Sequence, residues 1–490
     1  MRRQRPPRDH DRLDRTKLPG RASAWLAGLI VLGFAILFAW AGGGGAPAAG
    51  QPPAAGTIRP CNDSAATPVP QPTSAQMAAA GLDKLPVAPA DRRVDLIAPA
   101  FSRPTEVTNP LFPISSLASV VLNGKVDGKA FRTETTLLPD TRIIEWSPGQ
   151  CVKTLVSQYT AYLDGRIQEV ALDFYAQAAD GSVWYFGEDV YNYERGVVAD
   201  TSGTWLAGKE GPAAMIMPAN PKAGVVHRPE NIPGLVWEEV AVKEVGRTVS
   251  GPRGPITGAM VGSELHDDGT FSDKVFAPGY GEFYSAHEGD VEALALAVPT
   301  DALPGPTPRA LQRLSRGANH VFRVAASKRW RSVSATVRGM KAAWEAHRAD
   351  GAPRRLVAPT SRALKALALT VKTRNRGKTR NAALDVTQAA LDLTLRYRPP
   401  AEIDRARFDL WARQVRVDAA ARNHAAVSGD VATLEWIRDR IARTLDSVAV
   451  TRIDTQLEEL RADVADKKLA AAAKTATALR KVLARAGVTR

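Results

Sequence analysis

The sequence predicts an α+β protein of several domains, in which an antiparallel β-rich domain lies between an N-terminal transmembrane helix and a C-terminal α-helical bundle. Three observations support this fold class. Residues 22–41 form an uncharged apolar run, residues 87–303 contain short β-branched and aromatic runs, and residues 309–490 are rich in alanine, leucine and arginine. Because 490 residues exceed the usual size of a single hydrophobic core, we expect more than one folded unit.

The apolar run at residues 22–41 predicts a transmembrane signal-anchor. A helix rises ~1.5 Å per residue, so a run of this length covers the ~30 Å hydrocarbon core of a bilayer. Residues 1–21 contain eight Arg or Lys and three Asp or Glu. By the positive-inside rule this basic segment stays cytoplasmic, and the bulk of the chain is extracytoplasmic. The expected location is therefore the cell membrane, in a single pass. A cleaved signal peptide is the alternative, since small residues follow the run at residues 46–48.

Residues 42–86 are rich in Gly, Ala and Pro and predict a linker. The chain contains only two cysteines, Cys61 and Cys151, which are too few for a disulfide scaffold or a thiolate metal cluster. In an oxidising compartment these two could pair and tie the linker to the β-rich domain. The sequence leaves both a disulfide and two free thiols open.

Aspartate-glycine pairs punctuate residues 87–303 and predict hairpin turns, because Asp-Gly suits the positive φ angles of a tight turn between antiparallel strands. These pairs are Asp127-Gly128, Asp164-Gly165, Asp180-Gly181 and Asp268-Gly269. The segment therefore predicts an antiparallel meander. It contains no Walker string and no glycine-rich dinucleotide fingerprint, which argues against a nucleotide-binding parallel sheet.

The clearest predicted hairpin spans residues 167–188. If its loop has two residues, Tyr175 pairs with Phe186 and Asp173 pairs with Glu188. Two carboxylates directly opposite each other repel unless one is protonated, a cation lies between them, or the register differs. The hairpin therefore marks Asp173 and Glu188 as candidate functional residues.

A second candidate string contains Glu264 and His266, which alternation places on one face of another strand. Carboxylates with an imidazole suit a divalent metal or general acid/base chemistry. We therefore predict that Asp173, Glu188, Glu264 and His266 form a ligand or metal site, with a divalent metal as the candidate cofactor. The alternative is that the acids lie at a solvated sheet edge and that His266 is satisfied at a strand end.

Several aromatic strings occur in order between residues 105 and 300. They are Asn109-Pro110-Leu111-Phe112-Pro113, Asp173-Phe174-Tyr175-Ala176-Gln177, Val183-Trp184-Tyr185-Phe186-Gly187-Glu188, Gly203-Thr204-Trp205-Leu206-Ala207-Gly208 and Met217-Pro218. This set resembles an uncharacterised family of exported bacterial proteins. The resemblance implies an exported protein and brings no established activity. Ala178-Ala179-Asp180 stands where a more acidic turn is expected, which weakens the case for a cation in that turn.

Residues 309–490 predict an antiparallel helical bundle, because apolar residues recur at spacings of three, four and seven. The expected helices are residues 309–349, 359–373, 379–397, 401–427, 430–446 and 448–486. This half is strongly basic, with 38 basic and 17 acidic side chains, whereas residues 22–308 carry a net charge of −12. Residues 309–381 alone hold 19 basic and two acidic side chains.

The basic segment 309–381 predicts an anionic partner. Anionic lipid or a wall polymer fits a chain beyond the membrane, where nucleic acid is not expected. The alternative is that these arginines cover solvated helix faces and dock on the acidic β-rich domain.

The sequence contains neither the Gly-x-Ser-x-Gly motif of serine hydrolases nor the His-Glu-x-x-His motif of zinc proteases. An enzyme is therefore the less favoured hypothesis. The expected function is that of a membrane-anchored extracytoplasmic binding or scaffolding protein of unknown ligand. The alternative is a metal-dependent or acid/base enzyme of the cell envelope with its site in the β-rich domain.

Overall fold

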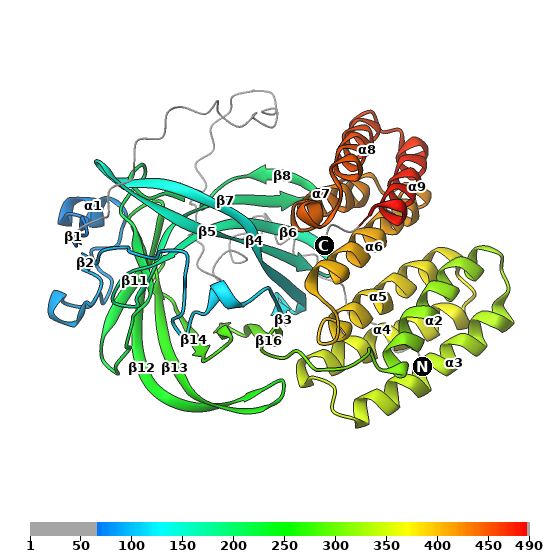
Figure 1. Cartoon of the computed structure of the whole chain (residues 1–490), viewed down its shortest axis with the longest axis horizontal. Helices are drawn as coiled ribbons and strands as arrows, with labels where there is room; N and C mark the ends of the chain where they lie inside the picture. The colour runs from blue at the N-terminus through cyan, green and yellow to red at the C-terminus, as the bar shows by residue number, and fades with distance from the viewer. Residues whose placement is uncertain (1–65, 488–490) are drawn as a thin grey trace, which may run out of the picture.

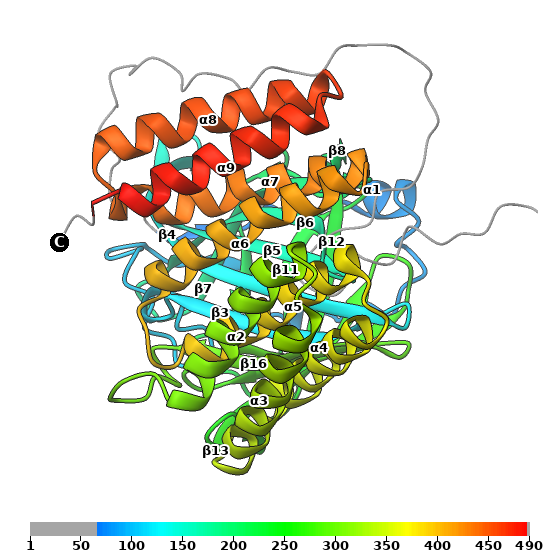
Figure 2. The ribbon, with the colours of Figure 1, turned by 90° about the vertical axis from the view of Figure 1, so that its right-hand side faces the viewer.

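A computed structural model describes residues 66–487 of the chain (Figure 1). A β-rich part covers the first half, and a helical part follows from residue 309. In Figure 1 the helices of the helical part lie together at one end of the curved strands, whereas α1 lies at the other end. Figure 2 looks onto this helical side and shows α8 and α9 at the opposite edge from α3.

The strands and helices have the following bounds. The strands are β1 (Thr67–Pro68), β2 (Ile97–Ala98), β3 (Ser119–Val126), β4 (Lys129–Ser147), β5 (Gln150–Leu163), β6 (Arg166–Gln177), β7 (Val183–Glu194), β8 (Val197–Asp200), β9 (Trp205–Leu206), β10 (Ala214–Met217), β11 (Val226–Ile232), β12 (Val236–Gly251), β13 (Gly254–His266), β14 (Phe271–Ala277), β15 (Gly281–His287) and β16 (Asp290–Val298). The α-helices are α1 (Ser74–Ala79), α2 (Arg309–Ala326), α3 (Trp330–Ala349), α4 (Arg354–Lys372), α5 (Arg376–Thr394), α6 (Pro400–Ala420), α7 (His424–Ile441), α8 (Ser447–Ala465) and α9 (Leu469–Arg485). Short 3₁₀ turns occur at Ala90–Arg92, Ile114–Ser116 and Ala442–Thr444.

The predicted fold class and location need correction in one component, the membrane-spanning helix. Within residues 66–487, none of the helices is long and apolar enough to cross a membrane. The run at residues 22–41, on which that prediction rested, lies outside the described residues. Within residues 66–487 the fold is therefore an antiparallel β-rich part followed by a helical part, and this part of the chain does not bear out the predicted transmembrane helix and single-pass membrane location.

One 14-stranded antiparallel sheet forms most of the β-rich part. Its strands run in the order β10-β7-β6-β5-β4-β3-β16-β15-β14-β13-β12-β11, and β8 and β9 pair with β7 beside this path. The two ends of the order, β10 and β11, lie against each other. His227 on β11 places its Nδ1 2.9 Å from the carbonyl oxygen of Met215 on β10. The sheet therefore curls until its ends meet, and one face is enclosed.

Two of the four Asp-Gly pairs form the predicted tight turns. Asp127 and Asp164 have φ angles of 52° and 49°, and each is followed by a glycine that also has positive φ. At Asp180 and Asp268 only the following glycine has positive φ, because these connections are longer. Each of these four Asp-Gly pairs thus marks a hairpin, but the pair set the loop length in only two of them.

The longer β6–β7 loop changes the predicted register of that hairpin. Tyr175 pairs with Tyr185, not with Phe186. An irregularity in the ladder then restores the predicted pairing of Asp173 with Glu188. Gly187 lies at this irregularity with φ +120°, and a Cβ there would meet the carbonyl oxygen of Trp205 at 2.2 Å. The return to the predicted register therefore depends on a glycine that lets β9 approach β7 closely.

Part of the predicted linker is folded against the sheet. β1 pairs with β2, and Leu82, which follows α1, is 1% exposed. Leu82 packs with Trp237 and Leu265, which lie on β12 and β13. Residues 66–86 therefore cover apolar side chains of the sheet.

The helical part consists of two groups of four helices. In the first group α2 contacts α3 and α5, and α4 contacts α3 and α5. In the second group α6 contacts α7 and α9, and α8 contacts α7 and α9. The predicted helix at 309–349 is divided at Lys328, and those at 401–427 and 448–486 are divided at Arg422 and Lys467. Each of these residues has φ between 57° and 59°, a left-handed conformation that ends a helix.

The two halves share one hydrophobic core. Val121, Tyr162 and Leu296 of the sheet belong to the same buried cluster as Leu311 and Val427 of the helices. In addition, α7 contacts β4, β6 and β8, and α4 contacts β16.

Buried ion pairs also cross this interface, in both directions. Arg132 of β4 binds Asp392 of α5 at 2.7 Å, whereas Glu134 of β4 pairs with Arg440 of α7. Both the sheet and the helices therefore contribute basic and acidic side chains to the interface, so the contact is not explained by an acidic sheet attracting a basic helical part.

Candidate functional site

The enclosed face of the sheet carries many buried charged side chains. They are Glu169, Asp173, Glu188, Glu230, Glu238, Glu264 and Glu292, with the partly buried Glu282 beside them and Lys274 and His266 as the cations. A charged group away from water is costly unless it is paired or neutralised. Carboxyl groups outnumber these cations, so part of the set must either hold protons or face a cation from outside.

All four residues predicted from the sequence lie in this enclosed set. Asp173 is opposite Glu188 on β6 and β7, and on β13 the Nε2 of His266 is 3.8 Å from Oε2 of Glu264. Glu230 is the partner of Glu238 across β11 and β12, and Glu238 contacts His266. The two predicted pairs are thus connected through Glu230 and Glu238.

Glu188 and Glu230 form a carboxyl pair at the closure of the sheet. Both side chains are fully buried, and their four carboxyl oxygens have no hydrogen-bond partner among the described residues. No basic side chain among residues 66–487 forms an ion pair with either group. Burial and the neighbouring carboxylates raise the pKa of both groups well above the usual value. Protonation of these groups would remove the cost of burying two negative charges.

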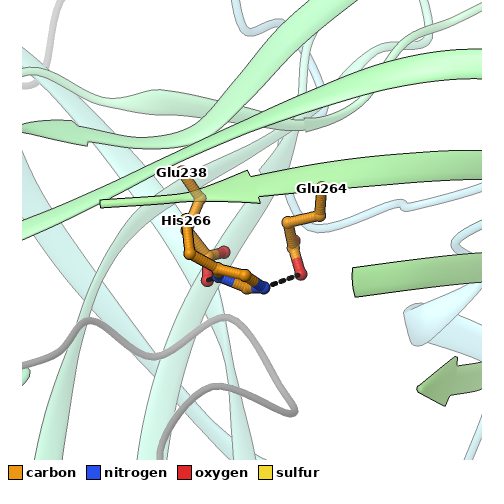
Figure 3. A group of neighbouring side chains, drawn as sticks. All are labelled: Glu238, Glu264 and His266. Atoms are coloured by element: carbon orange, nitrogen blue, oxygen red, sulfur yellow. Dashed lines mark hydrogen bonds and ion pairs between the residues drawn. The ribbon is translucent and has the colours of Figure 1, made fainter. Parts of the chain in front are cut away.

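His266 lies between Glu238 and Glu264 (Figure 3). Its Nδ1 is 3.1 Å from Oε1 of Glu238, and its Nε2 is 2.6 Å from Oγ of Ser272. Burial opposes a positive charge on the ring, but the hydrogen bond and charge of Glu238 outweigh it and raise the pKa of His266 to about 9. At neutral pH the imidazolium donates both N–H groups.

Lys274 supplies the second cation. Its Nζ is 3.1 Å from Glu264 and 3.3 Å from Glu282. Glu238, Glu264 and His266 have one ligand atom each within 4.8 Å of one another, which is a spacing that a metal ion could use. However, both nitrogens of His266 already make hydrogen bonds, and Lys274 places a positive charge beside Glu264. The set therefore fits a divalent cation poorly.

A cavity of about 90 Å³ adjoins this charged cluster. Its walls are largely apolar and include Phe112, Ile114, Leu117, Val120, Leu122 and Phe276. Asp173 and Glu282 are the acidic residues on its lining, and Ser157, Thr135 and Tyr159 add hydroxyl groups. Glu282 also binds Lys274, so it links the cavity to the charged cluster.

Asp173 is the least neutralised acid of the cavity. It accepts a hydrogen bond of 3.0 Å from the hydroxyl of Tyr185 and forms no ion pair with a residue in the described range. Burial raises the pKa of Asp173 to about 7, although Tyr185 opposes the shift. The nearby Oγ of Ser157 is buried and has no hydrogen-bond partner among the described residues. Asp173 can therefore take up or release a proton, or bind a cation, near neutral pH.

Sequence reasoning missed Glu230, Glu238, Ser272, Lys274 and Glu282. Their strands mix polar and apolar residues, so the sequence does not show that the face carrying these five residues is enclosed. Closure of the sheet turned this face inward. One feature could have marked them: Glu230 and Glu238 lie directly opposite each other on β11 and β12. Recognising this pair requires the register of these two strands.

Cys151 lies on β5 and is disulfide-bonded. The other cysteine of the sequence, Cys61, lies outside the described residues. The predicted pair is therefore described only at its Cys151 end.

The fold and the site define an α+β protein whose curled antiparallel sheet encloses an acidic, partly apolar cavity. No protein-family model and no curated protein matches the chain. The resemblance to an exported bacterial family therefore stays a prediction from the sequence.

Proposed function

We propose that the protein binds a small apolar molecule that carries one protonated amine. The observation that carries this proposal is the cavity of about 90 Å³, where apolar walls meet the carboxyl group of Asp173. Apolar pockets with a few placed polar groups are the usual form of small-molecule sites. The size suits a ligand of a few carbon atoms, or the apolar end of a larger one.

The charge of the surroundings supports an amine over an acid or a neutral alcohol. Three further buried carboxyl groups act on the lining: Glu188 is opposite Asp173, and Glu169 and Glu292 raise the pKa of Tyr159. A carboxylate ligand would bring a further negative charge to a place where burial already raises the pKa of these carboxyl groups, whereas an ammonium group would pair with Asp173 in a weakly screened environment.

Calorimetric titration of the full-length protein tests this proposal. We expect primary amines of four to eight carbons to bind, and alcohols and carboxylates with the same carbon skeleton to bind at least ten-fold more weakly. The Asp173→Asn variant should lose at least ten-fold in amine affinity. Asp273→Asn, an exposed change on β14, is the matched control and should behave as the wild type. Equal binding of amine and alcohol, or an unaffected Asp173→Asn variant, would overturn the proposal.

The same titration has an expected pH dependence. Because the pKa of Asp173 is raised to about 7, its ionised fraction in the free protein rises from roughly a tenth at pH 6 to roughly nine tenths at pH 8. Amine affinity should therefore rise about ten-fold over this range, and this rise should be absent in Asp173→Asn.

A serine hydrolase is the second candidate function, and one observation favours it. Ser272, His266 and Glu238 lie in the order of a nucleophile, base and orienting acid, at 2.6 and 3.1 Å. In such an enzyme His266 would take the hydroxyl proton of Ser272 as its oxygen attacks an acyl carbon. The raised pKa of about 9 keeps His266 protonated at neutral pH, and Ser272 is only 1% exposed, so ligand binding is the better supported function.

A fluorophosphonate probe distinguishes the two functions. A hydrolase would show covalent labelling of Ser272 that increases above pH 9 and disappears in Ser272→Ala. We expect no labelling of the folded protein between pH 6 and pH 8. Labelling at neutral pH would favour the hydrolase over the binding protein.

A further inference from the structure

The helical part contains a cleft of about 400 Å³ that is separate from the sheet. Five arginines line it, together with the ring of Phe322: Arg323, Arg380, Arg413, Arg416 and Arg480. They come from α2, α5, α6 and α9, and each of these helices contacts the next in the order α2, α5, α6, α9. The cleft therefore lies where the two four-helix groups meet, and the packing of four helices holds its arginines together.

The positive charge of the cleft is only partly balanced. Asp409 pairs with Arg413 and, at 2.6 Å, with Arg480. Arg323, Arg380 and Arg416 form no ion pair with any residue between 66 and 487. Five guanidinium groups and one carboxylate leave a local charge of about +4, because arginine stays protonated.

Two of the arginines also have unsatisfied buried donors. The Nε groups of Arg380 and Arg413 are buried and have no hydrogen-bond partner in the described part of the chain. The guanidinium of Arg380 lies 4.3 Å from the centre of the Phe322 ring, which holds it at the cleft wall.

The arginines of the cleft also repel one another. Burial and the charge of Arg416 lower the pKa of Arg380, and burial and the charge of Arg480 lower that of Arg416. An anion in the cleft would relieve this repulsion and satisfy the buried donors.

We propose that this cleft binds a small molecule with two phosphate groups, of which a diphosphate is the simplest example. One phosphate monoester carries about −1.5 to −2 charge at pH 7, so two such groups match the local charge of the cleft. Guanidinium groups bind phosphate oxygens in a bidentate manner, which favours arginine over lysine in such sites. The volume lies within the ~300–1,000 Å³ range of small-molecule sites. The ligand is distinct from the amine proposed for the sheet cavity.

Only two of the five cleft arginines belong to the basic segment 309–381 noted in the sequence. Arg323 and Arg380 belong to that segment, whereas Arg413, Arg416 and Arg480 come from later helices. A soluble diphosphate and the headgroup of a phospholipid share this chemistry. A cleft closed by four helices favours the soluble source, because a membrane surface is flat.

Calorimetric titration of the full-length protein with pyrophosphate at low ionic strength tests the proposal. Orthophosphate, sulfate and chloride at matched ionic strength are the comparison anions, and vesicles containing phosphatidylglycerol are the lipid arm. We expect pyrophosphate to bind at least ten-fold more tightly than orthophosphate or sulfate, and the vesicles not to compete with it.

The double variant Arg380→Gln/Arg416→Gln should lose at least ten-fold in pyrophosphate affinity. Neither residue forms an ion pair in the described structure, so the fold should be retained, and circular dichroism checks this. The matched control is Arg331→Gln/Arg338→Gln on exposed positions of α3, which removes the same charge outside the cleft. Equal binding of all anions, equal loss in the control, or displacement of pyrophosphate by vesicles would overturn the proposal. If the double variant unfolds, Arg323→Gln on its exposed site provides the same test.

Discussion

Lys274 is the residue that holds the inner charge cluster together. It is 1% exposed and contacts Glu264 and Glu282, and Glu282 also lines the cavity. Burial disfavours a charged lysine, but the charges of Glu264 and Glu282 outweigh this and raise its pKa above the usual value. The cluster is therefore a mutually dependent set of charges.

Lys274→Met should cost about 3–5 kcal/mol in the free energy of unfolding at pH 8, because it leaves Glu264 buried without its cation. The cost should be smaller at pH 5, where Glu264, whose pKa is raised to about 7, can bind a proton. Chemical denaturation at both pH values measures this. The double variant Lys274→Met/Glu264→Gln should recover most of the loss at pH 8, and no recovery would contradict the pairing.

The inner acids should also make stability depend on pH. Burial raises the pKa of Glu169 to about 8 and that of Asp173 to about 7, whereas both lie near 4 in an unfolded chain. The folded protein therefore binds more protons than the unfolded chain between about pH 4 and pH 8. The contribution of these groups to stability is present in full below pH 4 and is lost as the pH rises through 7 to 8.

Urea denaturation should accordingly show a falling midpoint from pH 5 to pH 9. Glu169→Gln should make the midpoint fall less steeply with pH, because it removes one carboxyl group whose pKa is raised. Glu194→Gln, an exposed change on β7, should leave the dependence unchanged. A midpoint that rises over this range would show that the inner acids are ionised in the folded protein.

At the scale of elements, side-chain patterns located strands and helices, but the backbone conformation decided where several helices end. The positions of four hairpins followed from Asp-Gly pairs, and the helical part followed from apolar spacing. Helix ends at Lys328, Arg422 and Lys467 were missed, because positive φ occurs there on residues that rarely adopt it. Such a helix end depends on the packing of the next helix rather than on a glycine signal.

Gly196 tests the docking of a turn on a helix. It has φ +82°, and a Cβ there would meet the carbonyl oxygen of Ala425 at 2.2 Å and the nitrogen of Gly429 at 2.4 Å on α7. Gly196→Ala should therefore destabilise the protein by ~1–3 kcal/mol more than Gly128→Ala, in addition to the strain that both share. Gly128 has φ +71° and open space around it, so it is the matched control. Equal effects in thermal denaturation would mean that the turn does not pack tightly on α7.

At the scale of the whole molecule, one buried ion network joins the two halves. Glu134 of β4 pairs with Arg132, Arg407 and Arg440, and the last two come from α6 and α7. Burial opposes ionisation of Glu134, but these three guanidinium groups outweigh it and lower its pKa below the usual range. Together with the shared core, this network predicts that both halves unfold together.

Glu134→Gln should destabilise the protein by about 3–5 kcal/mol, since it leaves buried guanidinium groups without their carboxylate. Arg461→Met removes an exposed pair with Glu435 and should cost less than about 1 kcal/mol. Hydrogen exchange under mild denaturant should show β4 and α7 opening in one step in the wild type. Separate opening of the two halves would contradict a single cooperative unit.

The sequence by itself determined the order of a β-rich part and a helical part, the approximate positions of four hairpins, and Asp173, Glu188, Glu264 and His266 as candidate site residues. These follow from local period, turn chemistry and composition, which act between near neighbours in the chain. It also predicted a membrane-spanning helix, and residues 66–487 contain none.

Only the tertiary structure decided that the sheet curls until β10 meets β11, so that a face with many polar and charged side chains becomes the interior. It likewise brought arginines from four helices into one cleft. Both features arise from contacts between residues far apart in the chain. The free energy of such contacts depends on which surfaces meet, and no local pattern records that.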